Sequence, residues 1–249
     1  MNVLIITEED VFYVYEFFRE FFPLMADAPY RVTGVSVLAA FNKRSYIDLA
    51  RQMYSFYGPA HFVSVGMRYV WRRLTGKTVT AVTRRFGVPL FETRSINAPS
   101  YIEKVKQLSP DVIVSVAAPQ LFKKEIIAAA RLGCINSHSA LLPQNKGMMP
   151  VFWAMLKGAK TLGVTIHYIN ERFDDGDIIM QESVPIGNES LHELILKTKR
   201  ISAHLIDTTL RRIADGAVTS APMPPGGSYQ SFPKPHDVRE FRRRGKKIM

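Results

Sequence analysis

The clearest fold signal in the chain is DVIVSVAAPQLFKKEIIAAARLGCINSH, residues 111–138. Its opening, DVIVSVAA, is a continuous apolar run of the kind found in strands that are buried on both faces of a parallel sheet. KKEIIAAARL predicts a short helix with Gly133 just past its end, and CINSH predicts the next strand. A strand, a helix and a second strand in this order predict a right-handed crossover between parallel strands.

The N-terminal half repeats this alternation. Short runs rich in β-branched residues predict strands over 3–6 and 31–38, and a brief strand is expected over 88–92. Helices are predicted over 10–22, 43–58 and 100–109, and a basic helical stretch over 59–87. Strands that alternate with helices predict an α/β domain with a mostly parallel sheet.

The pattern changes after residue 149. A helix over 149–158 is followed by alternating strands over 163–169 and 177–186, which an acidic turn separates, so an antiparallel strand pair is expected at the end of the sheet. A long helix is predicted over 190–216, with Ser190 as its N-cap and Glu193 completing a capping box. We therefore predict one catalytic domain over 1–216 and a short Pro/Gly-rich, basic C-terminal extension over 217–249.

The composition indicates which partners and which cellular compartment suit the protein. The net charge of +11 favours anionic partners, and the single cysteine, Cys134, excludes an internal disulfide and suits a reducing compartment. No apolar run is long enough for a membrane span, and the acidic N-terminus is unlike a secretory signal, so a cytoplasmic protein is expected. The basic segments 67–77 and 239–249 predict solvated faces and a frayed end. A nucleic-acid footprint is the alternative, but no binding motif accompanies them.

Most catalytic and cofactor motifs are missing from the sequence. It has no GxGxxG, Walker loop or GxSxG, and no HExxH or CxxC spacing, so no metal is expected. The turn after the first strand, IITEEDV, has no glycine and places carboxylates where an anion would lie. Nucleotide binding at that turn is therefore disfavoured.

Three segments carry side chains suited to chemistry. Asn136 and His138 alternate along one strand and so share a face, at the edge of a parallel sheet where ligands bind. The turn NERFDDGD holds Asp174 and Asp175, and LLPQNKGMMP places Gly147 before a helix. An amide donor, an imidazole base and a carboxylate suit acyl transfer to an amine. Ordinary turn residues are the alternative interpretation of each segment.

CINSHSALLPQNKGMMPVFWAMLKGAKTLGVTIHYINERFDDGDIIMQ resembles the core of the formyltransferases that use 10-formyltetrahydrofolate. Their signature is Asn-x-His, a Leu-Pro turn, a Gly before a helix, a Gly-x-Thr-x-His strand and an Asp in an acidic loop. The resemblance implies a Rossmann-like domain with Asn136, His138 and Asp174 as catalytic residues. It further implies His167, Lys146 and Gly147 on the substrate side, and folate contacts from Gln120, Leu121, Phe122, Asn170, Glu171, Arg172 and Phe173.

The resemblance also implies a mechanism, in which Asn136 and protonated His138 stabilise an oxyanion while Asp174 holds the histidine. Ser139-Ala140, where the family commonly has Pro-Ser, and residues 144–146 depart from the family near the acceptor side. Glycinamide ribonucleotide is disfavoured as acceptor by the glycine-free turn, and methionyl-tRNA by the shortness of 217–249. The deformylating hydrolase relatives carry a regulatory domain before the first strand, whereas this chain begins at that strand, so hydrolysis is not expected. A primary amine of a nucleotide-linked amino sugar is therefore expected, in a possible homodimer, and the rival is an inactive scaffold that uses its basic patches.

Overall fold

A computed structural model describes residues 1–38 and 46–249 of the protein. The first residues of the helix predicted over 43–58 lie outside the described residues. The strands are β1 (Asn2–Glu8), β2 (Arg31–Leu38), β3 (Leu90–Glu92), β4 (Val112–Val116), β5 (Cys134–His138), β6 (Lys146–Gly147), β7 (Thr161–Tyr168), β8 (Ile178–Pro185) and β9 (Tyr229–Gln230). The helices are α1 (Val14–Leu24), η1 (Met25–Asp27), α2 (Tyr46–Tyr57), α3 (Pro59–Leu74), α4 (Val79–Arg85), α5 (Pro99–Leu108), α6 (Lys124–Ile127), α7 (Pro150–Leu156), α8 (Leu191–Ala214) and α9 (Pro235–Arg243). Among the helices of the described residues, none is long and apolar enough to cross a membrane.

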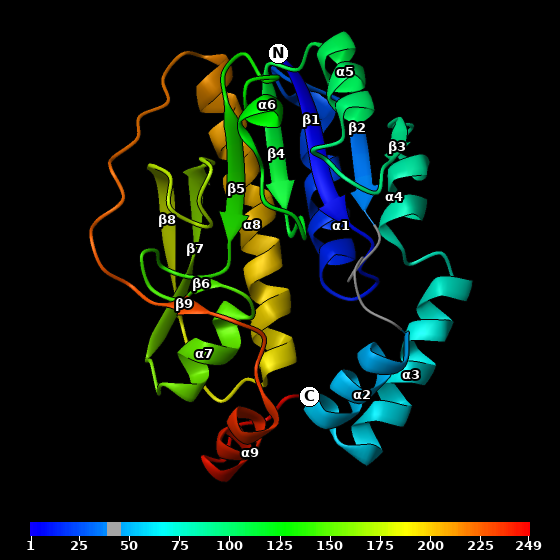
Figure 1. Ribbon diagram of the computed structural model, residues 1–249, viewed down its shortest axis with the longest axis vertical. Helices are drawn as coiled ribbons and strands as arrows, with labels where there is room; N and C mark the ends of the chain where they lie inside the picture. The colour runs from blue at the N-terminus through cyan, green and yellow to red at the C-terminus, as the bar shows by residue number, and fades with distance from the viewer. Residues whose placement is uncertain (39–45) are drawn as a thin grey trace.

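A seven-stranded sheet in the order β3-β2-β1-β4-β5-β7-β8 forms the centre of the molecule (Figure 1). The strands from β3 to β5 run parallel, whereas β7 is antiparallel to β5 and β8 is antiparallel to β7. The predicted α/β, Rossmann-like sheet with an antiparallel pair at its end is therefore confirmed. In the register of this sheet Asn136 faces Ser115 on one neighbouring strand and His167 on the other.

Helices cover both faces of the sheet. One face packs against α1, α4 and α8 through a cluster that includes Phe17, Val82 and Ile206, and Figure 1 shows α8 running along the back of the strands. The other face packs against α5 and α6 through a second cluster that contains Cys134 and Phe122. Side chains of a strand alternate between faces, so Asn136 and His138 lie on the same side as Cys134, the α5/α6 side.

Two predictions about these elements need correction. The helix expected to run to Gly133 ends at Ile127, because the chain must turn back for Cys134 to pair beside Ile113. Two N–H groups of this turn, those of residues 131 and 132, bond to the carbonyls of residues 110 and 111 instead of extending the helix. Because α6 ends at Ile127, the chain reaches β5 through a turn.

The C-terminal extension is not an extended segment with a frayed end, as the sequence suggested. It contains β9, which pairs with β6, and α9, whose Val238 and Phe241 are buried. The Phe241 ring stacks on Phe152 of α7 with centroids 4.6 Å apart. The apolar side chains of Val238 and Phe241 on α9 explain this packing. The sequence did not reveal it because many arginines surround them. The domain boundary at residue 216 stays a prediction.

Candidate active site

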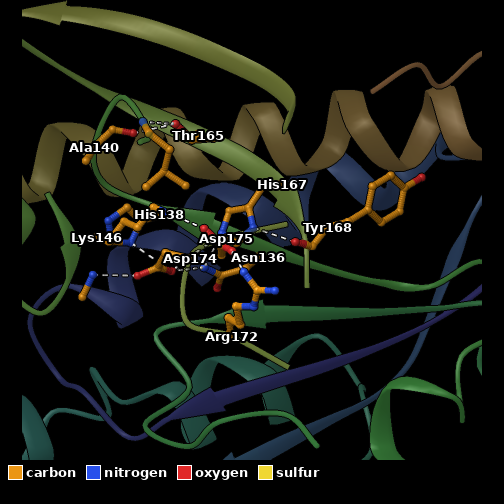
Figure 2. Close-up of polar contacts among 12 residues, drawn as sticks. Asn136, His138, Ala140, Lys146, Thr165, His167, Tyr168, Arg172, Asp174 and Asp175 are labelled. Carbon is orange, nitrogen blue, oxygen red and sulfur yellow. Dashed lines mark hydrogen bonds and ion pairs between the residues drawn. The ribbon is translucent and has the colours of Figure 1, made fainter. Parts of the chain in front are cut away.

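Three side chains converge on the carboxylate of Asp174 (Figure 2). Asn136 Nδ2 lies 3.4 Å, His138 Nδ1 3.5 Å and His167 Nε2 3.7 Å from Asp174 Oδ1. Asn136 and His138 come from β5, and antiparallel pairing places His167 of β7 directly opposite Asn136. The loop between β7 and β8 supplies Asp174. The structure thus brings together the three residues predicted as catalytic, together with His167.

The hydrogen bonds of His167 fix the orientation of the Asn136 amide. His167 Nδ1 lies 2.7 Å from the carbonyl oxygen of Tyr168, which only accepts, so Nδ1 carries the hydrogen. Its Nε2 lies 3.1 Å from Asn136 Nδ2, an amide nitrogen that only donates, so Nε2 accepts this hydrogen. The second Asn136 hydrogen points toward Asp174 at 3.4 Å. Both amide hydrogens are therefore engaged inside the cluster.

His138 is held from its other side by a backbone carbonyl. Its Nε2 lies 2.9 Å from the carbonyl oxygen of Asn145, so this nitrogen donates, and Nδ1 is the atom that faces Asp174. Burial lowers the pKa of His138 below its ordinary value of 6.5, although Asp174 and the Asn145 carbonyl favour the charged form. The lowered pKa favours the neutral imidazole in the resting site, and the protonated form of His138 in the catalytic step stays a prediction.

Asp174 is ionised and held in a left-handed backbone conformation. Burial raises its pKa, but the opposing effects of His138, His167 and the Gly147 N–H outweigh burial and lower the pKa to about 2. The Gly147 N–H donates to Asp174 Oδ2 at 2.7 Å. The φ of Asp174 is +49°, a region that Asp and Asn occupy more readily than other non-glycine residues. The loop is thus shaped to aim this carboxylate inward.

Gly147 joins the site to the C-terminal extension. Its φ is +91°, and a Cβ added there would overlap the carbonyl oxygen of Gln230. The same carbonyl accepts a hydrogen bond of 2.8 Å from the Met148 N–H, next to the β6–β9 pair. Only glycine permits this close approach and so keeps its own N–H on Asp174.

The second carboxylate of the acidic loop points elsewhere. Asp175 forms an ion pair with Lys146, and Arg172 Nη1 lies 3.2 Å from its Oδ2 (Figure 2). The predicted substrate residue Lys146 therefore lies beside the cluster and bonds to Asp175. Phe173 of the same loop is 50% exposed, and its ring lies near that of Tyr229.

The residues after β4 that were predicted to line the folate pocket already form contacts with other parts of the chain. Gln120 bonds to the backbone of Arg94 and Ile96, at 2.8 and 3.0 Å. The Leu121 carbonyl accepts from the Asn97 side chain, and Phe122 is 4% exposed within the core. These contacts rigidify the segment. Whether its residues contact a ligand stays a prediction, as it does for residues 170–173.

Thr165, the threonine of the Gly-x-Thr-x-His strand, is a supporting residue that was not predicted. Its buried hydroxyl donates to the Ala140 carbonyl at 2.6 Å and accepts from the Leu142 N–H at 3.1 Å. Gln181 Nε2 also donates to the Thr165 hydroxyl oxygen, at 2.8 Å. These bonds fix the chain as it leaves β5, just after His138. The threonine of the motif was the signal that could have identified this role.

Two acidic residues after β1 close the N-terminal ends of nearby helices. The Glu9 carboxylate accepts from the Val79 and Thr80 N–H groups of α4, at 2.8 and 3.2 Å. Asp10 Oδ1 accepts from the N–H groups of Phe12 and Tyr13 just before α1, both at 2.6 Å. The chain's own carboxylates thus take N–H groups that a phosphate would need. Among the described residues, no group of three or more His, Cys, Asp or Glu side chains is arranged to hold a metal ion.

Residues 68–206, which contain the whole cluster around Asp174, match the family model described as formyl transferase. The chain belongs to the formyl transferase family. Methionyl-tRNA formyltransferases are among the curated members similar to it. That of Chlorobium chlorochromatii is 40% identical over 136 residues, which are 54% of this chain and 43% of that protein. That of Clostridioides difficile is 38% identical over 130 residues, 52% of this chain and 42% of that protein. The chain thus spans less than half the length of these relatives.

Solved structures share the fold of this formyl transferase family member. A sugar N-formyltransferase from Shewanella has a TM-score of 0.61 at 21% identity, covering 92% of this chain and 76% of that chain. Glycinamide ribonucleotide transformylase 1 from Symbiobacterium toebii also has a TM-score of 0.61, at 17% identity, covering 87% and 88% of the two chains. At these identities the likeness establishes the fold, and the acceptor has to be argued from the site.

Proposed function

We propose that the protein transfers a formyl group to a primary amine, with 10-formyltetrahydrofolate as the donor. The observation that carries this proposal is the convergence of Asn136, His138 and His167 on an ionised, buried Asp174 inside the family match. Such a cluster offers an acceptor for a proton and a donor for a developing negative charge, which are the two needs of acyl transfer to an amine.

His138 and Asp174 act together on the proton that the amine loses. The neutral imidazole has its Nδ1 free to accept, because Nε2 already donates to the Asn145 carbonyl. A proton at Nδ1 then faces Asp174 Oδ1 at 3.5 Å, where the carboxylate stabilises the imidazolium. Burial keeps the resting ring neutral and the carboxylate makes its protonation feasible, so the pair is suited to take up one proton during turnover.

Asn136 supplies the hydrogen-bond donor for the developing oxyanion. Of its two bonds, the one to Asp174 is the longer, at 3.4 Å against 3.1 Å to His167. A bond near the upper limit of length is weak, so this hydrogen is the more easily redirected to a substrate oxygen. The bond to His167 meanwhile keeps the amide in place, which gives His167 a positioning role.

The residues present fit the folate donor, which supplies an activated formyl group when bound. Two loops border the Asn136 side of the sheet, residues 117–122 after β4 and 169–177 after β7. Ala118, Phe122 and Ile169 of these loops pack in one cluster, so both loops lie over the same face. The half-exposed Phe173 offers an aromatic surface for a flat heterocycle. Leu121 and residues 170–173 are the proposed contacts, while Gln120 and Phe122 hold their loop in shape.

For the acceptor we favour a nucleotide-linked amino sugar. The net charge of +11 favours an anionic substrate, and the extension over 217–249 folds against the catalytic body and borders Gly147. A small acceptor suits a site that is bordered by the C-terminal extension. Methionyl-tRNA is the second candidate, because the matching half of the methionyl-tRNA formyltransferases is 30–40% identical to this chain.

One acceptor screen tests the proposal. The protein is incubated with 10-formyltetrahydrofolate and either a panel of nucleotide-linked amino sugars or methionyl-tRNA, and products are examined by mass spectrometry for the gain of one formyl group. Formylation of an amino sugar supports the favoured acceptor, and formylation of methionyl-tRNA alone replaces it with the second candidate. Release of free formate without transfer to any amine would contradict the assignment as a transferase.

A further inference from the structure

Helix α3 carries an apolar stripe that the described part of the chain leaves uncovered. Its side chains are Val63, Met67, Val70, Trp71 and Leu74, and they are between 54% and 82% exposed. Figure 1 shows α3 at the edge of the molecule, away from the central sheet. We propose that this stripe is a dimer interface, in which two copies of the chain pack their α3 helices antiparallel about a two-fold axis.

The spacing of the stripe is that of a helix–helix seam. Val63, Met67, Val70 and Leu74 follow one another at intervals of four, three and four residues. These are the intervals of the a and d positions of a heptad, which place a narrow row of side chains against one partner helix. With the two-fold axis midway between Met67 and Val70, Met67 of one copy faces Val70 of the other. Val63 then faces Leu74 at each end.

The same axis matches the largest side chain of the stripe to its one hollow. Gly66 lies in the middle of α3, and apart from its chain neighbours and the backbone of its own helix, no atom of the described residues is within 4 Å of the position a Cβ would take. Glycine is less stable than alanine in an exposed helix, and nothing in this neighbourhood requires it. Under the two-fold pairing, Trp71 of one copy lies over Gly66 of the other. The helix surface is thus self-complementary, as an interface between identical chains requires.

Two basic residues of α3, Arg68 and Arg72, contact the body of the protein. Arg72 Nε donates to the Val11 carbonyl at 2.6 Å, and its Nη2 lies 3.1 Å from Glu16 Oε1. Arg68 Nη2 lies 3.5 Å from His192 Nε2. These two cations bind the protein's own body and are therefore not free to contact an anionic membrane or nucleic acid.

The remaining cations near the stripe select the antiparallel arrangement. Arg73 bonds to the Tyr69 hydroxyl, and the Lys77 ammonium lies 4.4 Å from the centre of the Trp71 ring, both toward the C-terminal end of α3. Parallel helices would bring these charges of the two copies side by side. Antiparallel helices separate the two Arg73 positions by roughly 13 Å along the axis, beyond the screening length of physiological salt.

The exposed area is adequate for association. At roughly 150–250 Å² for an aromatic side chain and less for an aliphatic one, the five partly exposed residues offer on the order of 500 Å² of apolar surface per copy. This is as large as the largest apolar patch on a typical monomer, and such patches are often functional. It is also most of the roughly 800 Å² that each partner contributes to an interface of standard size.

Sedimentation velocity of the 249-residue chain at micromolar concentrations tests the proposal. We expect a dimer for the wild type, and association weakened roughly a hundredfold or more for Met67→Glu, since a carboxylate would be buried unpaired in the seam. The matched control is Ile47→Glu on α2, where the residue replaced is 66% exposed against 65% for Met67. This variant should remain as dimeric as the wild type.

A second variant separates loss of the interface from loss of folding. Gly66→Leu raises the helix propensity of α3 and fills the hollow, so it should abolish the dimer while its circular dichroism spectrum stays that of the wild type. A wild type that stays monomeric at these concentrations overturns the proposal. A wild-type dimer that Met67→Glu and Gly66→Leu both leave intact overturns it equally.

Discussion

Replacing Asp174 with Asn removes the negative charge at the centre of the cluster while keeping the size of the side chain. The folded protein lowers the pKa of Asp174 from 3.8 to about 2. At about 1.4 kcal/mol per pKa unit, this difference corresponds to about 2 kcal/mol of the free energy of unfolding. The side chain is only 12% exposed, so solvent screens this contribution little.

The sign of the effect follows from the lowered pKa. The unfolded chain binds a proton more readily than the folded one, so the contribution of Asp174 is complete above about pH 4. It is lost as the pH falls toward about 2, where the folded carboxylate also becomes protonated. The wild type should therefore lose about 2 kcal/mol of stability through this residue between pH 4 and pH 2, a loss that Asp174→Asn cannot show.

Urea unfolding measured at intervals from pH 7 to pH 2 gives both curves. The matched control is Asp175→Asn, whose side chain is twice as exposed, at 24%, and is paired with Lys146 and Arg172. It should retain most of the acid dependence of the wild type. Formyl transfer by Asp174→Asn should fall by a factor of about 10² to 10⁴, because protonated His138 loses its counter-charge. An Asp174→Asn curve that runs parallel to the wild type down to pH 2 would refute this reasoning.

Three further predictions follow from the same geometry. Because burial lowers the pKa of His138 and turnover needs its neutral form, the acid limb of the pH–rate profile should have its midpoint below 6.5; a midpoint above 6.5 would contradict this. Gly147→Ala should cost on the order of 2 kcal/mol in urea unfolding and reduce formyl transfer, because the methyl group displaces Gln230 and the N–H that bonds to Asp174. Thr165→Val should cost roughly 1–3 kcal/mol in the same assay, since it leaves the Leu142 N–H without its partner, whereas Thr165→Ser should cost much less.

Local patterns in the sequence predicted much of the fold. The apolar run over 112–116 and the alternation of Asn136 with His138 depend only on strand periodicity, and the structure has both. The capping box of α8 likewise involves neighbours in the chain, with the Ser190 N–H donating to Glu193 Oε2 at 2.7 Å. Features of this kind are set by residues a few positions apart, so one sequence is enough to reveal them.

The parts that the sequence did not predict depend on distant pairings. The contact of His167 with Asn136 requires the register of β5 against β7, and the position of Gly147 requires Gln230 to return from the C-terminal extension. The lowered pKa of His138 was not predicted for a similar reason. Its pKa is lowered by burial, which results from packing of the whole domain and has no signature in the residues beside it.

The most direct test of the central claim is the single-turnover rate of formyl transfer from 10-formyltetrahydrofolate to the amine found by the acceptor screen, compared between the wild type and His138→Asn. If His138 takes up the proton beside Asp174, the variant should be slower by a factor of about 10² to 10⁴ while its circular dichroism spectrum stays that of the wild type. A folded His138→Asn variant that transfers the formyl group at nearly the wild-type rate would contradict the account.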